Sequence, residues 1–481
     1  MTRSVPLAIA IAAAVGCFAW LQARTPHLVD QDSYYHARYA QLLPERGLSR
    51  EFPWMRESIW RDRFSDKDLL FHAILAPFCR GEDVVGGAKA AAWGFDAAIV
   101  VALALVLTRH GFRAPWLWVL LVPALGNHWL FRMLEVRGHL LSVFLFLLGV
   151  HFLLAKKSLG LYVVGFVFAW SYAAPHLLVG FAAVDAVARS IDERRFVWKP
   201  LAASAGGVVA GLIVHPYFPN DLQLWWVQNV LVLSRAWGVQ GEAALRLGGE
   251  FAPVTTRDLL LTATLPALCL AGAFLAAVFR RDELSARTRM LAAYAVAAFA
   301  LYCLSAKFVE YFAPLALLVA ASVVSDLWPE GAGRRVLLVL AVLVVGGLLA
   351  TKSLSDTRRA VKALPAPDLE GASKWIRANV PAGETIVHVD WGDFVQLFCF
   401  DPTHRYLVGL DPTFGYERDA SRMRLLEDIR FRRRPLDPKE LARTFGGKWL
   451  VLKSRDVPLA SDALLSPAYE DDGAAVYRLA D

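Results

Sequence analysis

Two carboxylates stand two residues apart in segment 30–36, which reads Asp-Gln-Asp-Ser-Tyr-Tyr-His and directly follows the first apolar block of the chain. Carboxylate oxygens bind divalent cations and accept protons, so the spacing of Asp30 and Asp32 suits a cation site or a general base. Tyrosine and charged side chains are also normal where a loop meets a membrane surface. The spacing alone therefore leaves a chemical and an interfacial interpretation open.

A second group of chemically capable side chains lies in residues 132–139. Glu135 and His139 stand four residues apart, so on a helix they would share a face and could bind a divalent metal such as Mg²⁺ or Mn²⁺. Arg132 and Arg137 from the same segment are equally able to hold a phosphate group. The sequence does not choose between these two uses.

Two further charges lie near apolar blocks. Lys307 stands at the border of two blocks, where a lysine serves as a membrane-surface anchor or as a cation that holds phosphate. Glu310 lies inside the following block, where a charged side chain tends to face a cavity.

The elements that must position these residues are helices in a membrane. The chain has 481 residues, is 56% hydrophobic and carries a net charge of +7, and its apolar residues gather in long blocks. Lipid cannot satisfy backbone groups, so each block is expected to be a helix. The eleven expected helices cover roughly residues 5–23, 86–108, 115–131, 138–155, 159–174, 176–190, 200–217, 258–279, 290–305, 308–325 and 335–353.

The loops between the blocks predict the orientation. With the N-terminus in the cytoplasm, five short loops are cytoplasmic, and each contains at least two Lys or Arg residues, as the positive-inside rule requires. This bias explains many of the basic residues, so nucleic acid is not an expected partner. The chain is predicted to be a multi-pass α-helical protein of the lipid bilayer, with a transmembrane domain at 1–353 and outward loops at 24–85 and 218–257. Residues 354–481 are expected to form a small extracytoplasmic α/β domain.

Local patterns predict the elements of that C-terminal domain. An amphipathic stretch at 369–379, closed by Pro381, indicates a helix. Runs rich in strand-forming residues at 385–389 and 406–410 indicate β-strands, as do the runs at 449–453 and 475–479.

The acidic segment resembles a known family. Asp-x-Tyr-Tyr-His-x-Arg at 32–38 is similar to the motif after the first helix of the catalytic subunit of oligosaccharyltransferase, a member of the GT-C class of polytopic glycosyltransferases. The resemblance implies that Asp32 is a catalytic or metal-binding aspartate, with Asp30 as its neighbour, and that the donor is a sugar on a lipid phosphate. It also implies acceptor contacts from Tyr34, Tyr35 and His36.

Two later segments resemble the same family. Lys-Phe-Val-Glu-Tyr-Phe-Ala-Pro at 307–314 is similar to its Arg-Phe-x-x-Tyr-x-x-Pro motif, with Lys307 in place of the arginine that faces the donor phosphate. Segment 389–394 resembles its Trp-Trp-Asp-Tyr-Gly signature, which implies acceptor contacts from Trp391 and Asp393, although Gly392 replaces the second tryptophan and the order is shifted.

Segments 132–139 and 218–257 extend the comparison. The family has an acidic or metal-binding pair in its second outward loop, and segment 132–139 departs from that pattern. Its later outward loop carries a mobile segment with a functional glutamate, which Glu242 or Glu250 would match here.

The resemblance and the topology together predict a membrane glycosyltransferase, active on the extracytoplasmic side of a bacterial plasma (inner) membrane. It would transfer a sugar or oligosaccharide from a polyprenyl-phosphate or pyrophosphate donor to an extracytoplasmic protein or glycan acceptor, with a divalent metal as a possible cofactor. Two alternatives stay open at this point: a transporter or flippase of lipid-linked or small solutes, and a non-catalytic membrane assembly protein.

Overall fold

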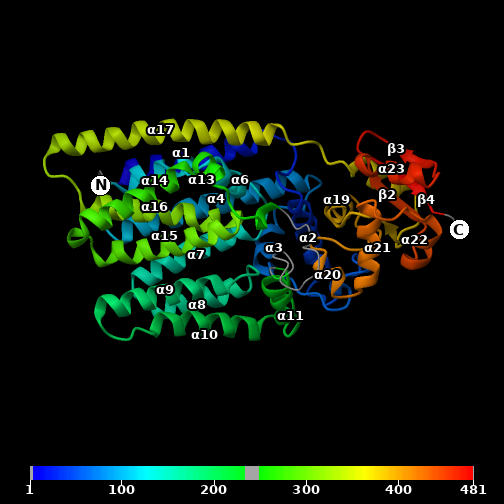
Figure 1. Ribbon diagram of the computed structural model, residues 1–481, viewed down its shortest axis with the longest axis horizontal. Helices are drawn as coiled ribbons and strands as arrows, with labels where there is room; N and C mark the ends of the chain where they lie inside the picture. Colours follow the sequence, from blue (N-terminus) through cyan, green and yellow to red (C-terminus); the bar gives the residue numbers. More distant parts are fainter. Residues whose placement is uncertain (1–3, 233, 235–248, 480–481) are drawn as a thin grey trace.

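The computed structural model describes residues 4–232, 234 and 249–479, so Glu242 lies outside the described residues. Long helices run side by side through one part of the molecule, and an α/β unit closes the opposite end (Figure 1). The N-terminus lies among the helices and the C-terminus in the α/β unit.

Four described helices are long and apolar enough to cross a membrane, and a bent pair raises the number to five. The bent pair, α13 and α14, turns by 100° at its break, and shorter apolar helices pack beside the long ones. The count of eleven spans and the cytoplasmic N-terminus therefore stay predictions. The main helices of this part of the molecule, whether or not they are long enough to cross a membrane, are α1 (Ser4–Gln22), α4 (Val84–Arg109), α7 (His139–Leu154), α8 (Ser158–Ala169), α9 (His176–Glu193), α10 (Lys199–Val214), α13 (Thr256–Thr262), α14 (Thr264–Phe279), α15 (Ala286–Leu304), α16 (Val309–Asp326) and α17 (Ala332–Lys362).

The prediction of one continuous helix over 115–131 is wrong, because the segment is broken. It forms α5 (Pro115–Leu120), a short 3-10 turn and α6 (Asn127–Met133). Gly126 at the break has φ +112°, and a Cβ there would lie 1.9 Å from the Thr262 carbonyl oxygen. Only glycine tolerates that backbone conformation at such a close approach. The break frees α6 to carry Arg132 toward the α/β unit.

Helices α8 and α10 pack through glycine, which yields a stability prediction. A Cβ on Gly207 would lie 2.1 Å from the Tyr162 carbonyl oxygen, whereas one on the adjacent Gly206 would make ordinary contact at 3.7 Å with the Tyr162 ring. We expect Gly207→Val to lower the stability of the protein by about 1–3 kcal/mol or more, because the helices must separate. Gly206→Val is the matched control. Thermal unfolding in detergent measures both, and equal midpoints for the two variants would contradict the close packing.

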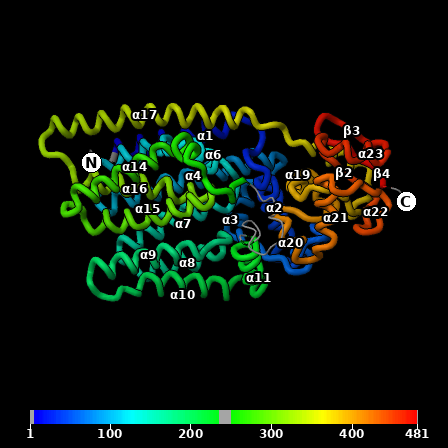
Figure 2. Tube along the Cα trace, viewed as in Figure 1, coloured from blue at the N-terminus to red at the C-terminus, as the bar shows by residue number. Residues whose placement is uncertain are grey.

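The segment after α1 lies between the helices and the α/β unit, as the tube trace shows (Figure 2). It contains α2 (Asp32–Arg46), the 3-10 turn Ile59–Arg61 and α3 (Leu69–Leu75). Tyr35 of α2 stacks on Tyr39, and its ring also contacts Phe398 of the α/β unit. Aromatic rings bury large apolar areas, so this cluster fixes α2 between the two parts of the molecule.

The α/β unit contains a four-stranded sheet of order β1-β2-β4-β3. Strand β1 is parallel to β2, and the β2–β4 and β4–β3 pairs are antiparallel. Its strands are β1 (Ile386–Val387), β2 (Trp449–Lys453), β3 (Pro467–Glu470) and β4 (Ala474–Arg478), and its helices are α18 (Glu370–Asn379), α19 (Phe394–Phe400), α20 (Thr413–Tyr416), α21 (Ala420–Arg430), α22 (Pro438–Phe445) and α23 (Pro458–Asp462).

The strand expected at 406–410 is not formed. Tyr406 donates its backbone N–H to the Trp54 carbonyl oxygen and accepts from the Arg56 N–H, leaving only an isolated bridge with Met55. The backbone partner of Tyr406 is therefore the segment after α2 rather than the sheet, and Leu410 has a left-handed φ of +65°. This contact is a second attachment between the α/β unit and the rest of the chain.

Candidate functional site

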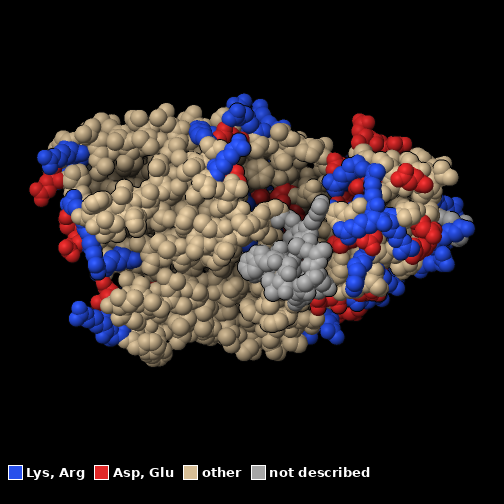
Figure 3. Space-filling view, in the orientation of Figure 1, with Lys and Arg blue, Asp and Glu red and all other residues tan. Residues whose placement is uncertain are grey.

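Two adjoining cavities lie where the helices meet the α/β unit. The inner cavity has a volume of about 150 Å³ and the outer cavity about 570 Å³, and Asp32, Arg137 and Glu250 line both. The space-filling view shows a hollow at this junction with acidic atoms exposed inside it (Figure 3). Several of the sequence-predicted residues therefore lie around these two cavities.

Arg137 lies among four carboxylates. Its guanidinium nitrogens lie 3.1 Å from Asp32 Oδ2, 3.2 Å from Glu250 Oε2, 3.7 Å from Asp30 Oδ2 and 3.9 Å from Glu135 Oε2. Asp32 begins α2, Glu250 lies in the turn Gly249–Phe251, and Arg137 precedes α7, so three distant segments meet here. The guanidinium neutralises part of a negative charge that the carboxylates could not sustain alone.

A second arginine joins the same network from α6. Arg132 is buried, with Nη1 at 2.7 Å from Glu135 Oε2 and 2.8 Å from Glu250 Oε2, and Nε at 2.8 Å from Glu310 Oε1. Both arginines thus have carboxylate partners already. These partners do not favour the role in binding donor phosphate that the sequence predicts for Arg132 and Arg137.

The residues present do not fit a divalent metal. Glu135 lies in the turn before α7 and His139 begins that helix, so they do not share the expected helix face. His139 Nε2 lies 2.8 Å from the Arg132 carbonyl oxygen and is committed to it. Within the described residues, no group of three or more His, Cys, Asp and Glu side chains is placed to hold a metal ion. The position between Asp30 and Asp32 is filled by Arg137.

Burial and charge set the protonation of Asp32. Burial raises the pKa of Asp32 to about 7, the Arg137 guanidinium acts to lower it, and the neighbouring Asp30 and Glu250 carboxylates raise it. Burial also acts to raise the pKa of Glu250, but Arg137 and Arg132 hold that pKa well below its usual range. One carboxyl of the network is therefore poised near neutral pH while its neighbour stays ionised, a division typical of acid–base sites.

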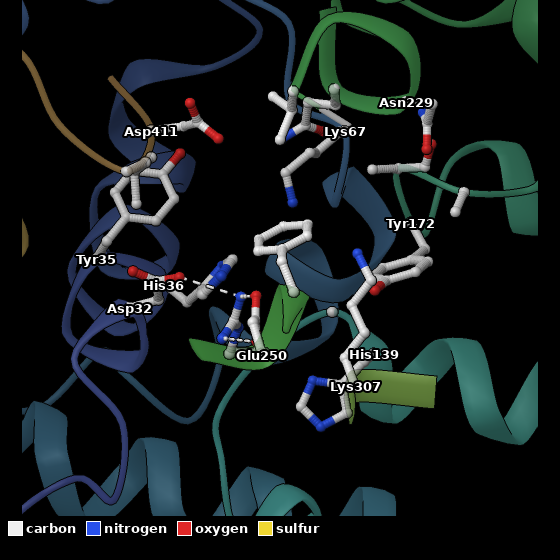
Figure 4. A pocket seen from close by; sticks show the side chains of 18 of the residues that line it. Asp32, Tyr35, His36, Lys67, His139, Tyr172, Asn229, Glu250, Lys307 and Asp411 are labelled. Atoms are coloured by element: carbon white, nitrogen blue, oxygen red, sulfur yellow. Dashed lines mark hydrogen bonds and ion pairs between the residues drawn. The ribbon is translucent and has the colours of Figure 1, made fainter. Parts of the chain in front are cut away.

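Two lysines point into the inner cavity (Figure 4). Lys307 has its ammonium 4.2 Å from the centre of the Phe251 ring, and among the described residues it has no ion-pair partner. Lys67 approaches from the outward segment and pairs with Asp68 at 2.5 Å. The sequence predicts Lys307 as a phosphate-binding cation. It does not predict Lys67, whose only signal in the sequence is its place in a charged run.

The residues expected to contact the acceptor divide into two groups. Tyr35 and His36 line the inner cavity and Trp391 lines the outer one. Tyr34 is instead buried against Phe400, and Asp393 is buried 3.1 Å from the Lys453 ammonium. The structure thus brings Tyr35, His36 and Trp391 to the cavities and leaves Tyr34 and Asp393 in supporting positions.

Sequence reasoning assigned no role to Asp390, at the wall of the outer cavity. Its Oδ2 accepts from Arg430 at 2.7 Å and from Arg455 at 2.5 Å, and its Oδ1 accepts from the Gly392 N–H. These contacts fix the turn that presents Trp391. Asp411, from the loop before α20, lines both cavities.

Solved structures share this architecture. No protein-family model and no curated protein matches the sequence. The structure of the Archaeoglobus fulgidus oligosaccharyltransferase in its apo form matches 100% of this chain and 74% of that chain, with a TM-score of 0.65 at 13% identity. The same organism's oligosaccharyltransferase AglB, with an inhibitory peptide and a dolichol-phosphate, matches 94% and 69% with a TM-score of 0.62 at 12% identity.

A third structure extends the likeness beyond oligosaccharyltransferases. ArnT from Cupriavidus metallidurans, bound to undecaprenyl phosphate, matches 98% of this chain and 98% of that chain, with a TM-score of 0.63 at 13% identity. The chain thus has the fold of a multi-pass membrane protein of the GT-C class, as the motifs predicted.

Proposed function

We propose that this chain, which has the oligosaccharyltransferase-like fold of the GT-C class, is a membrane glycosyltransferase that uses a polyprenyl-phosphate-linked sugar donor. Solved structures of this fold hold a dolichol-phosphate in AglB and undecaprenyl phosphate in ArnT. The observation that carries the proposal is the Asp32 carboxyl beside Arg137, with a pKa of about 7, in a cavity that Lys307 also lines. The cavity would face the extracytoplasmic side of a bacterial plasma membrane.

The proposed reaction assigns each charged group one task. The attacking oxygen or nitrogen of the acceptor forms a bond to the anomeric carbon of the donor sugar, while the bond from that carbon to the phosphate oxygen breaks. Asp32 takes the proton of the attacking group, and Arg137 holds the carboxylate in place. Lys307 and Lys67 offset the charge that develops on the leaving lipid phosphate.

The outer cavity supports a place for the acceptor. It opens between the helices and the α/β unit, and Trp391 and Leu410 line it together with Asp32. An extracytoplasmic protein or glycan entering there would bring its reactive group to Asp32. A structure of the archaeal enzyme tethered to an acceptor peptide has the same fold at 14% identity with a TM-score of 0.61.

The direct test is transfer by the purified protein. The protein is incubated with a labelled sugar on undecaprenyl phosphate and an envelope extract as a source of acceptors, and labelled products and free lipid phosphate are quantified. The proposal expects both to appear in equal amounts. Movement of intact donor across a bilayer without release of lipid phosphate would instead favour a transporter.

The protonation of Asp32 predicts a pH dependence. Its carboxylate form is the active base, and its pKa is raised to about 7. Transfer is therefore expected to be half-maximal near pH 7, to approach its full rate one to two pH units above it, and to fall by about tenfold per pH unit well below it. The rate with saturating donor, measured from pH 5 to 9, checks this, and a rate that stays flat down to pH 5 would contradict the role of Asp32.

Lys307 predicts an effect on donor binding. We expect Lys307→Gln to weaken binding of undecaprenyl phosphate roughly tenfold to a hundredfold, because a charged hydrogen bond to phosphate is lost. The measurement is the ligand-induced rise in the thermal unfolding midpoint, with the uncharged undecaprenol as the ligand control. Lys362→Gln, an exposed site on α17, is the matched variant, and equal binding by both variants would remove Lys307 from the phosphate site.

A further inference from the structure

Behind the inner cavity lies a hydrogen-bonded row of three titratable side chains. His36 Nδ1 is 2.8 Å from His72 Nε2, and His72 Nδ1 is 2.8 Å from the Asp66 carboxylate oxygens. The three residues come from α2, from α3 and from the loop before α3, and they are 5%, 1% and 2% exposed. The proposed transfer reaction assigns no role to these three residues.

The order of partners fixes which nitrogens carry protons. A carboxylate only accepts hydrogen bonds, so His72 must hold its proton on Nδ1 and donate it to Asp66. His72 Nε2 then carries a lone pair and accepts the proton of His36 Nδ1. His36 Nε2 is left unprotonated, as a hydrogen-bond acceptor.

That acceptor nitrogen belongs to a side chain of the inner cavity wall. His36 follows Asp32 by one helical turn on α2, and Figure 4 shows both side chains at the same side of the cavity. Among the described residues, no group donates to His36 Nε2. Burial lowers the pKa of His36 well below its usual value, and His72, Lys67 and Arg137 lower it further, so the ring stays neutral.

We propose that His36 Nε2 is a fixed hydrogen-bond acceptor that binds a hydroxyl group of the donor sugar, and that His72 and Asp66 are positioning residues that set its tautomer. The inference rests on the proposed glycosyl transfer. A hydroxyl bound at this nitrogen is held one helical turn from Asp32, in the cavity that Lys307 lines. The row therefore orients the sugar, and the proton of the attacking group still goes to Asp32.

Asp66→Asn is the variant that changes the tautomers of His72 and His36 with little change in the shape of the side chains. Asp66 Oδ1 also accepts from the Asp68 N–H at 3.0 Å, so the amide oxygen of the variant keeps that bond and its NH₂ group faces His72 Nδ1. His72 must then protonate Nε2, and His36 in turn protonates its own Nε2. The cavity acceptor becomes a donor with little change in shape, as expected of a carboxylate-to-amide change behind a histidine.

The test combines spectroscopy with kinetics on the full-length protein. In ¹⁵N-histidine-labelled protein, with His36→Gln to assign the signal, we expect wild-type His36 Nε2 to be unprotonated and Asp66→Asn to protonate it. With the labelled undecaprenyl-phosphate sugar, Asp66→Asn is expected to lower kcat/KM roughly tenfold to a hundredfold, mainly through a higher KM for the donor, because two donors then face each other.

The control is Asp221→Asn, a buried aspartate of α11 (Asn220–Trp226) outside the row of His36, His72 and Asp66, and it is expected to transfer at the wild-type rate. A wild-type His36 protonated at Nε2 would overturn the inference, as would unchanged kinetics in an Asp66→Asn protein with the switched tautomer. A shift in the midpoint of the pH–rate profile of Asp66→Asn would also overturn it, since His36 would then be the base. Absence of transfer by the wild type would count against the glycosyltransferase itself, and the ¹⁵N spectra would still decide the tautomer.

Discussion

Replacing Asp32 with asparagine is expected to lower kcat by about 10²–10⁴-fold, the contribution of a positioned general base. The change keeps the shape of the side chain and removes its ability to accept a proton. It also removes one of the four carboxylates around Arg137, but Asp30, Glu135 and Glu250 still hold the guanidinium. The protein should therefore fold, and initial rates with saturating donor measure the chemical defect.

The matched control for this variant lies on the same helix. Glu45 is exposed near the end of α2, away from the cavities, so Glu45→Gln changes the charge of the helix by the same amount. We expect it to transfer at the wild-type rate. If Asp32→Asn and Glu45→Gln have the same kcat, Asp32 is not the base.

Replacing Arg137 with alanine is expected to have the second large effect, on stability and activity together. Asp30, Asp32 and Glu250 would face one another without the guanidinium, and loss of one partner from a buried ion-pair network costs about 3–5 kcal/mol. Activity should fall with it, because like charges would hold Asp32 protonated. Arg137→Lys should recover part of both, since lysine supplies the charge without the planar fork.

The response to metal makes the Arg137 prediction specific. If the guanidinium takes the place of a cation among these carboxylates, the alanine variant should gain an oxygen-rich site for Mg²⁺ or Mn²⁺. Its thermal unfolding midpoint should rise on adding either ion, whereas that of the wild type and of Arg424→Ala, an exposed change on α21, should not. A wild-type midpoint or transfer rate that depends on added divalent ions would contradict this arrangement.

Local sequence patterns predicted the elements whose cause is local. The helix at 370–379, for example, follows from an amphipathic stretch. The break in segment 115–131 was not predicted, because it is caused by the approach of Thr262 to Gly126 from a helix far along the chain. The strand expected at 406–410 is not formed, because Tyr406 bonds to the backbone of Trp54 and Arg56, more than 300 residues earlier, and no strand pattern reveals that partner.

The sequence predicted which residues lie at the candidate site better than it predicted what those residues do. Asp32 and Glu250 line both cavities, whereas Asp30 lines the outer cavity and Lys307 the inner one. The pairing of Arg137 with carboxylates was missed because it depends on how the turn before α7 packs against α2 and the turn Gly249–Phe251, which are far away in the sequence. His72 and Asp66 were missed because an isolated histidine and aspartate carry no signal until α2 and α3 pack together.

The most direct test of the glycosyltransferase is one measurement on sealed proteoliposomes of known orientation. A labelled sugar on undecaprenyl phosphate is placed in one leaflet at a time, with acceptor on the same side and EDTA present, and free lipid phosphate is followed over time. Release of lipid phosphate matched by labelled acceptor is expected only when donor and acceptor are on the side of the α/β unit. Intact donor appearing in the opposite leaflet without release of lipid phosphate would contradict the glycosyltransferase, whereas release that EDTA abolishes would contradict only the metal-free arrangement around Arg137.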